Sequence, residues 1–216
     1  HVFHLSTAKE LSQFSNKIPL KDKKITSEVC IHHLWFNDKD YEKKGTKIKW
    51  NPAVKTEKDQ KALLKALNND FIDVLATDHA PHTKEEKNNT YLKAPSGGPL
   101  VQHALVALLE MYHQKKIKLT KIVEKACHNP AILFDVENRG YIREGYFADL
   151  VLVDLNAPWT VQNENIFSKC GWSPFESTTF RSRVTHTFVN GNLVYENFKF
   201  PKLAENYKAE RLRFNR

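Results

Sequence analysis

The sequence predicts an α/β protein with a parallel sheet, followed by a smaller β-rich portion. Apolar runs of strand length alternate with amphipathic helical patterns over residues 1–138, and polar side chains follow the ends of these runs. The clearest run, residues 71–76, is apolar on both faces, as in a buried parallel strand. From residue 139 onward, strand patterns and turn residues replace the helices. The first part holds four strand–helix units, too few to close a barrel of eight strands.

Spacing and capping residues define the expected elements of the first part. Thr7 and Glu10 form a capping box that opens a helix, Thr56 caps a second, and Thr120 caps a helix that ends before Pro130. We therefore expect strands at residues 1–5, 26–31, 47–50 and 71–76, and helices at residues 8–14, 56–67, 102–114 and 120–128.

The second part shows strand patterns at residues 149–154, 184–189 and 193–195. Asn190 and Gly191, between the last two runs, are typical of a tight hairpin turn. We predict three segments: a barrel-like α/β part over residues 1–138, a β-sheet portion over residues 139–200, and a charged tail, helical or frayed, over residues 201–216.

Composition narrows the classes of partner. The net charge is +8, but the lysines are spread among many acids, so a solvated surface is expected and no nucleic-acid partner. No apolar run approaches the ~20 residues of a membrane helix. The three cysteines are widely spaced, which predicts neither disulfides nor a thiolate zinc site and favours the reducing cytoplasm.

The start of the chain resembles the interior of a strand. The only methionine is Met111, and residues 1–5 read HVFHL. We therefore expect this chain to be the C-terminal piece of a longer protein.

Polar side chains that can bind a metal follow three of the predicted strands. His4, His33 and Asp78 are expected at one edge, because the carboxyl ends of parallel strands meet there. Imidazole and carboxylate are the ligands of catalytic zinc sites, which keep one position for water. A carboxylate beside that water can also carry its proton. Packed histidines and an ordinary polar loop are the alternative interpretation, but the convergence of three strand ends favours a site.

These residues carry a resemblance to a known family. Residues 76–82, ATDHAPH, with Lys87 further on, resemble the C-terminal signature of the dihydroorotases, which are amidohydrolases. Residues 1–7, 29–34 and 51–55 resemble that family's fifth strand, sixth strand and substrate-binding segment. The tail, with ADLVLVD at residues 148–154, resembles the family's β-sandwich. The resemblance covers nearly the whole chain.

The resemblance implies a partial TIM-like (β/α)8 barrel of the metal-dependent hydrolase type, with a small β-sandwich portion at its C-terminal end. It implies one or two zinc ions, with His4, His33 and Asp78 as ligands and Asp78 as general acid and base. Asn51, His82 and the backbone of Ser96 and Gly97 would bind substrate. The implied reaction is the reversible cyclisation of N-carbamoyl-L-aspartate to L-dihydroorotate in pyrimidine biosynthesis.

Some of the family's pattern is absent from this chain. The His-x-His pair of its first strand and the bridging carboxylated lysine or aspartate of its fourth are not in these residues, and Lys55 replaces an arginine. We therefore expect the chain alone to be inactive, with the N-terminal half of the same protein as a partner and a homodimer as one option. The alternatives are a related cyclic amidase (dihydropyrimidinase or allantoinase) and a non-catalytic scaffold for aspartate transcarbamoylase.

Overall fold

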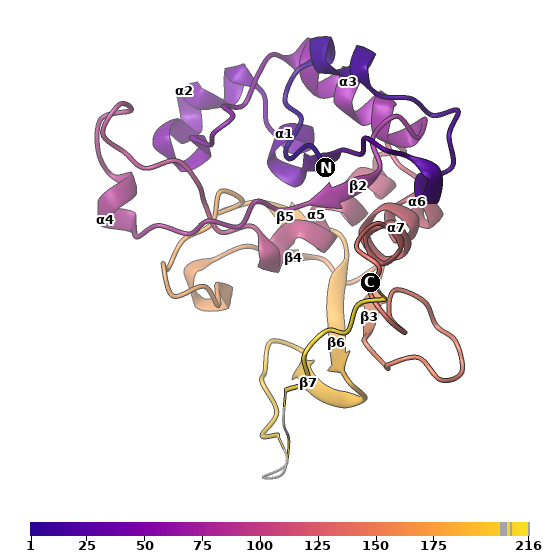
Figure 1. The fold of residues 1–216 in the computed structure, drawn as a ribbon. Helices are drawn as coiled ribbons and strands as arrows, with labels where there is room; N and C mark the ends of the chain where they lie inside the picture. The colour runs from indigo at the N-terminus through magenta and orange to yellow at the C-terminus, as the bar shows by residue number, and fades with distance from the viewer. Residues whose placement is uncertain (204–206, 208, 216) are drawn as a thin grey trace.

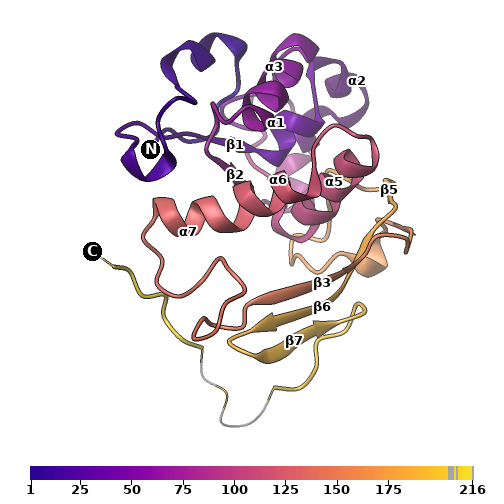
Figure 2. The same cartoon turned by 90° about the vertical axis from the view of Figure 1, so that its right-hand side faces the viewer.

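The computed structural model describes residues 1–203, 207 and 209–215. In these residues, a body of short helices surrounds two parallel strands, and a separate antiparallel sheet lies beneath it (Figures 1 and 2). Part of the predicted tail, residues 204–206, 208 and 216, lies outside the described residues. The rest of residues 201–216 contains no helix.

Two parallel strands form the centre of the body. β1 (Glu28–Cys30) pairs with β2 (Val74–Ala76), with Cys30 opposite Ala76. The predicted strand at residues 1–5 is present as an extended segment beside β1, where Val2 bridges Ser27 and the Leu5 amide donates to the Glu28 carbonyl at 2.9 Å. The predicted α/β architecture with parallel pairing is confirmed.

The strand predicted at residues 47–50 is wrong. The chain there forms the 3-10 helix η4 (Gly45–Ile48), and the Lys49 amide donates to the Thr46 carbonyl. Ile48 and Trp50 are both buried. Alternate buried residues in so short a run are compatible with a tight helical turn as well as with a strand, and here the backbone closes on itself.

Two of the predicted helices form close to their expected bounds. α3 (Glu57–Asn68) begins after Thr56, whose hydroxyl accepts from the Asp59 amide, and it buries Leu63 and Leu67. α5 (Val101–His113) is apolar along most of its length and buries residues 106–111. The helix predicted at residues 8–14 is the 3-10 helix η1 (Ala8–Gln13), with the expected Thr7–Glu10 capping box.

The helix predicted at residues 120–128 is longer than expected. α6 (Leu119–Val123), the π-helical turn η5 (Glu124–His128) and α7 (Asn129–Leu133) follow one another without a break. Pro130 therefore lies in the first turn of α7 and does not end the helix. Because Pro130 has no backbone N–H, it cannot donate a hydrogen bond within this continuous run, and the turn before it is π-helical.

The C-terminal sheet has the strand order β3-β6-β7, with all pairs antiparallel. Its strands are β3 (Leu150–Asp154), β6 (Arg183–Val189) and β7 (Asn192–Glu196). Asn190 and Gly191 both have positive φ (51° and 78°), which confirms the predicted hairpin. The predicted segment bounds and the sandwich remain predictions.

The remaining described elements are short. They are α1 (Ile31–Trp35), α2 (Tyr41–Lys44), α4 (Lys84–Lys87), β4 (Trp159–Thr160), β5 (Thr179–Phe180), η2 (Leu20–Asp22), η3 (Asp38–Asp40) and η6 (Asn163–Asn165). Among the helices of the described ranges, none combines the length and apolar character needed to cross a membrane.

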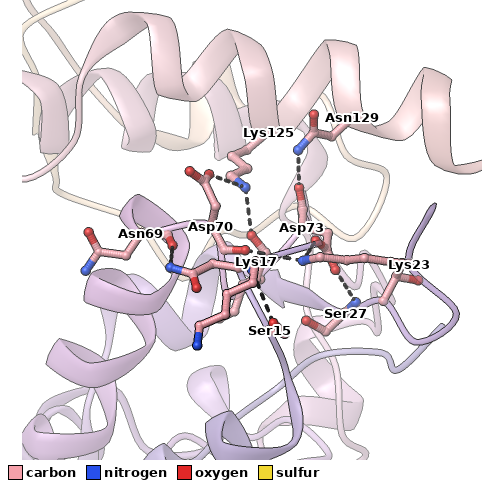
Figure 3. A network of polar contacts seen from close by, with 12 residues as sticks. Ser15, Lys17, Lys23, Ser27, Asn69, Asp70, Asp73, Lys125 and Asn129 are labelled. Carbon is pink, nitrogen blue, oxygen red and sulfur yellow. Dashed lines mark hydrogen bonds and ion pairs between the residues drawn. The ribbon is translucent and has the colours of Figure 1, made fainter. Parts of the chain in front are cut away.

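A polar network anchors the beginning of β2 (Figure 3). The Asp73 carboxylate accepts from the Lys23 ammonium at 2.5 Å and from the Ser27 amide at 2.9 Å. The buried Lys125 ammonium donates to the Ile72 carbonyl at 2.8 Å. These charge-assisted bonds attach β1 and the η5 helix to the amino end of β2, leaving the carboxyl ends of the strands for other side chains.

Candidate active site at the ends of the parallel strands

The carboxyl ends of β1 and β2 lie side by side, because Cys30 and Ala76 are partners in the parallel register. Beyond Cys30 the chain enters α1, which carries His32 and His33. Beyond Ala76 it reaches Asp78. The register thus places His33 and Asp78 at the same end of the sheet.

His33 has the features of a metal ligand. It is buried, and its Nε2 lies 3.1 Å from the Pro52 carbonyl oxygen, which can only accept. Burial is the main cause that lowers the pKa of His33 to about 4, so the ring is neutral at pH 7 and its single proton is on Nε2. The buried Nδ1 has no hydrogen-bond partner. It therefore keeps a free lone pair, and the Nε2–Pro52 bond holds the ring as ligating histidines usually are held.

His4 and Asp78 share an uncommon backbone conformation. Their φ angles are 41° and 48°, in the left-handed region that non-glycine residues adopt rarely and mostly at sites where the surroundings impose it. Burial raises the pKa of the Asp78 carboxyl, the interaction with His4 opposes this rise, and Glu28 adds to it. His4, Glu28 and Asp78 are therefore close enough to interact electrostatically.

The structure does not complete the predicted three-ligand cluster. Within the described residues, no group of three His, Cys, Asp or Glu side chains is placed to hold a metal ion. The donor types nevertheless suit zinc: neutral imidazole with an unpaired buried nitrogen, and a half-buried carboxylate. The assignment of His4, His33 and Asp78 as ligands therefore stays a prediction.

Three of the residues predicted to bind substrate lie together. His82 Nε2 is 3.0 Å from the Ser96 carbonyl oxygen, and the Gly97 amide donates to the Lys49 carbonyl at 2.9 Å. Gly97 has a φ of 118°, and a Cβ atom there would lie 2.5 Å from the Ala80 carbonyl oxygen. This position therefore requires glycine, and the turn packs directly against residues 79–82.

Asn51 is exposed and directly precedes Pro52, whose carbonyl accepts from His33. It therefore lies beside the predicted metal ligand, although its side chain makes no hydrogen bond among those described.

A cavity of about 500 Å³ opens beside His82. Its walls include His79 and Glu86 from one part of the chain and Ser168 and Lys169 from another. The Trp172 indole donates to the His82 carbonyl at 2.7 Å, which attaches the two parts. The cavity offers space for a small molecule next to the predicted substrate residues.

Two further residues, His32 and Glu28, interact electrostatically with the predicted ligands. His32 stacks on Trp50 with ring centroids 4.3 Å apart and planes at 10°, which is the packing alternative that the sequence left open for such histidines. Burial is the main cause that lowers the pKa of His32 well below its usual value. Glu28 was missed at the level of sequence: its carboxylate lies 3.1 Å from His1 Nε2, and its charge raises the pKa of Asp78. A single glutamate before an apolar strand gives no signal of such a role.

Comparison with known sequences places these residues in context. The sequence model of the amidohydrolase family matches residues 1–194. Dihydroorotase from Clostridioides difficile is 35% identical over 172 residues, covering 79% of this chain and 40% of that protein. Dihydroorotases from Endomicrobium trichonymphae and Pyrococcus abyssi are each 34% identical over 197 residues, covering 91% of this chain and 46% of each protein. The resemblance predicted from the motifs is confirmed, and the chain spans about half the length of these relatives.

Solved structures give a second comparison. The L-hydantoinase (dihydropyrimidinase) from Arthrobacter aurescens superposes with a TM-score of 0.85 at 25% identity, covering 93% of this chain and 46% of that one. The dihydropyrimidinase from Brevibacillus agri superposes with a TM-score of 0.78 at 24% identity, covering 92% and 45%. The second likeness bears on the fold alone.

Proposed function

Because the chain belongs to the amidohydrolase family, we propose that it is the C-terminal half of a zinc-dependent dihydroorotase. Such an enzyme interconverts N-carbamoyl-L-aspartate and L-dihydroorotate in pyrimidine biosynthesis. Under this proposal, β1, β2 and their helices are part of a TIM-like barrel, and β3, β6 and β7 are part of a β-sandwich. The similarity to curated dihydroorotases over most of the chain supports the choice of substrate.

The unpaired Nδ1 of His33 is the observation that carries the metal-dependent part of the proposal. A buried nitrogen without a partner is costly unless something binds it. We assign His33, His4 and Asp78 as zinc ligands, with further ligands supplied by the N-terminal half. Zinc at this position would polarise a carbonyl group and make water available as a nucleophile at neutral pH.

The chain's own residues would bind the substrate and move its proton. Asp78 is partly desolvated, and its raised pKa suits a group that accepts a proton and returns it to the leaving nitrogen. His82 and Asn51 would bind the substrate carboxylate and amide edge. The turn at Ser96 and Gly97 would present backbone groups to the same molecule, and the His82–Ser96 bond would hold both in place.

A substrate assay tests the proposal. The chain is assayed alone and together with its N-terminal half, with dihydroorotate, hydantoin and allantoin as substrates. Turnover of dihydroorotate by the combined halves, and none by the chain alone, is the expected result. Turnover of hydantoin or allantoin without dihydroorotate would refute the dihydroorotase assignment.

A dihydropyrimidinase is the second candidate, because a hydantoinase structure superposes on nearly the whole chain. The same assay separates it from a dihydroorotase. A non-catalytic scaffold is a third hypothesis, which metal analysis tests: less than about one zinc per reconstituted protein would favour the scaffold, because catalysis of this type depends on the metal.

A further inference from the structure

Lys87 is a buried lysine whose ammonium group is surrounded by backbone carbonyls. Only 3% of the residue is exposed. Its Nζ donates to the carbonyls of Gly97 at 2.8 Å, Pro95 at 2.9 Å and Lys49 at 3.3 Å. Among the described residues no carboxylate pairs with it. The three hydrogens of the ammonium thus match three carbonyl acceptors.

Such an arrangement has an electrostatic cost. Burial, with a smaller contribution from Lys49, lowers the pKa of Lys87 to about 8. A methionine could fill a similar volume without this cost, so the hydrogen bonds of the ammonium are what distinguishes lysine here. Hydrogen bonds from a charged donor are stronger than those between neutral groups, so three of them hold their acceptors firmly.

Lys87 also lines a cavity of about 510 Å³ together with Lys43, Lys44, Lys47 and Lys84. A cavity lined by lysines suggests an anion-binding site. However, the donors of Lys87 are already used by the three carbonyls, so this lysine has none left for an anion. Its contacts point to the turn at residues 95–98.

That turn connects the two parts of the candidate site. On one side, the Ser96 carbonyl is bonded to His82 and Gly97 packs on Ala80. On the other side, a Cβ atom at Gly98 would lie 2.9 Å from the ring of Trp50, on which His32 stacks. A shift of the turn would therefore move His82 and disturb the packing beside His32 and His33.

We propose that Lys87 is a positioning residue that ties the turn at residues 95–98 in place, so that Ser96, Gly97 and His82 keep the arrangement that binds substrate. The catalytic part of this inference rests on the proposed function, whereas the structural part does not. Lys87 touches neither the predicted metal ligands nor the cavity beside His82. It acts through the turn.

Amide hydrogen exchange of Lys87→Met tests the structural part in the protein that contains this chain. Lys84→Met is the matched control, because Lys84 lies on the same short helix, is exposed, and has no hydrogen bond to the turn among those described. We expect exchange of the amides of residues 96–98, including that of Gly97, to be about tenfold faster or more in Lys87→Met. Exchange in β1 and β2 should stay unchanged in both variants.

Steady-state kinetics test the catalytic part. In Lys87→Met, KM for dihydroorotate should rise about tenfold with a smaller change in kcat, since substrate positioning is lost and the proton-carrying Asp78 is intact. Lys87→Arg, which keeps the charge and several donors, should recover part of the exchange protection and of KM.

Three outcomes would overturn the inference. They are unchanged exchange of the amides of residues 96–98, an unchanged KM in a protein that turns over dihydroorotate, and exchange that rises equally throughout β1 and β2. The last outcome, which includes global unfolding, would mean that Lys87 supports the whole fold. If the wild-type protein fails to turn over dihydroorotate, the proposed function fails, while the exchange experiment still decides whether Lys87 ties the turn.

Discussion

His33 and Pro52 are joined by a hydrogen bond of 3.1 Å between the imidazole Nε2 and the backbone carbonyl oxygen. This bond leaves the other ring nitrogen, Nδ1, buried and unpaired at the carboxyl end of β1. The helix α1, which follows β1, thus holds the neutral imidazole of His33 in a fixed orientation. This imidazole lies at the same end of the sheet as the segment that follows β2. The first two predictions follow from this placement.

Replacing His33 should lower the metal content of the protein. His33→Ala removes a proposed ligand, so less zinc should remain bound after dialysis against a weak chelator. His128→Gln is the control, because His128 stacks on Tyr141 in a different region. Elemental analysis measures zinc per protein, and equal zinc in the two variants would contradict the assignment.

Replacing Asp78 should abolish proton transfer while leaving the fold intact. In Asp78→Asn, the rate of dihydroorotate turnover should fall about 10²–10⁴-fold, the usual contribution of a positioned acid or base. Asp38→Asn, at an exposed aspartate of η3, should keep full activity. Thermal unfolding measured alongside separates a catalytic loss from misfolding, and a fully active Asp78→Asn protein would rule out the role.

Gly97 should tolerate no side chain. Gly97→Ala places a Cβ atom 2.5 Å from the Ala80 carbonyl oxygen and forces alanine to a φ of 118°. We expect a loss of about 1–3 kcal/mol in the free energy of unfolding, the usual cost of such strain. Gly145→Ala is matched, because Gly145 also has a positive φ but meets no atom within 4 Å. Urea unfolding should show the larger loss for Gly97→Ala, and equal losses would contradict the close packing of the turn.

The stack of His32 on Trp50 should contribute strongly to stability. Trp50→Ala leaves a cavity between His32 and Gly98, with an expected cost of about 3–5 kcal/mol in the free energy of unfolding. Trp50→Phe keeps an aromatic plane and should cost less. Urea unfolding measures both variants. An alanine variant that loses less than about 1 kcal/mol would contradict the tight packing around the indole.

Acidification should destabilise the protein partly through His103. This ring is buried against Ser173, Trp159 and Phe175, and burial lowers its pKa to about 4. Between about pH 6.5 and pH 4 the unfolded chain binds this proton and the folded chain does not, so stability falls as the pH falls. The expected contribution is about 3 kcal/mol over this range.

His103→Gln cannot be protonated, so its free energy of unfolding should depend less steeply on pH over the same interval. Urea unfolding at several pH values measures the slope for both proteins. Because the comparison uses slopes, a constant loss of packing in the variant does not affect it. Identical slopes would contradict a neutral buried His103.

Local spacing in the chain was enough to predict much of the architecture. The apolar run before Asp78, the Thr56 cap and the Asn190–Gly191 turn act over a few residues, so their signals are readable without knowing what surrounds them. The same local signals allowed the carboxyl ends of β1 and β2 to be named as the place of the candidate site.

Contacts between distant parts of the chain decided the structural features that the local residue pattern did not determine. Residues 47–50 form no strand, because Lys47 and Ile48 end the 3-10 helix η4 and Trp50, beyond it, is held against His32, 18 positions earlier. The three carbonyl groups that accept from the Lys87 ammonium belong to residues 49, 95 and 97. No local sequence pattern indicates this arrangement. Contacts between distant segments depend on how the whole chain folds, so short-range periodicity carries no signal for them.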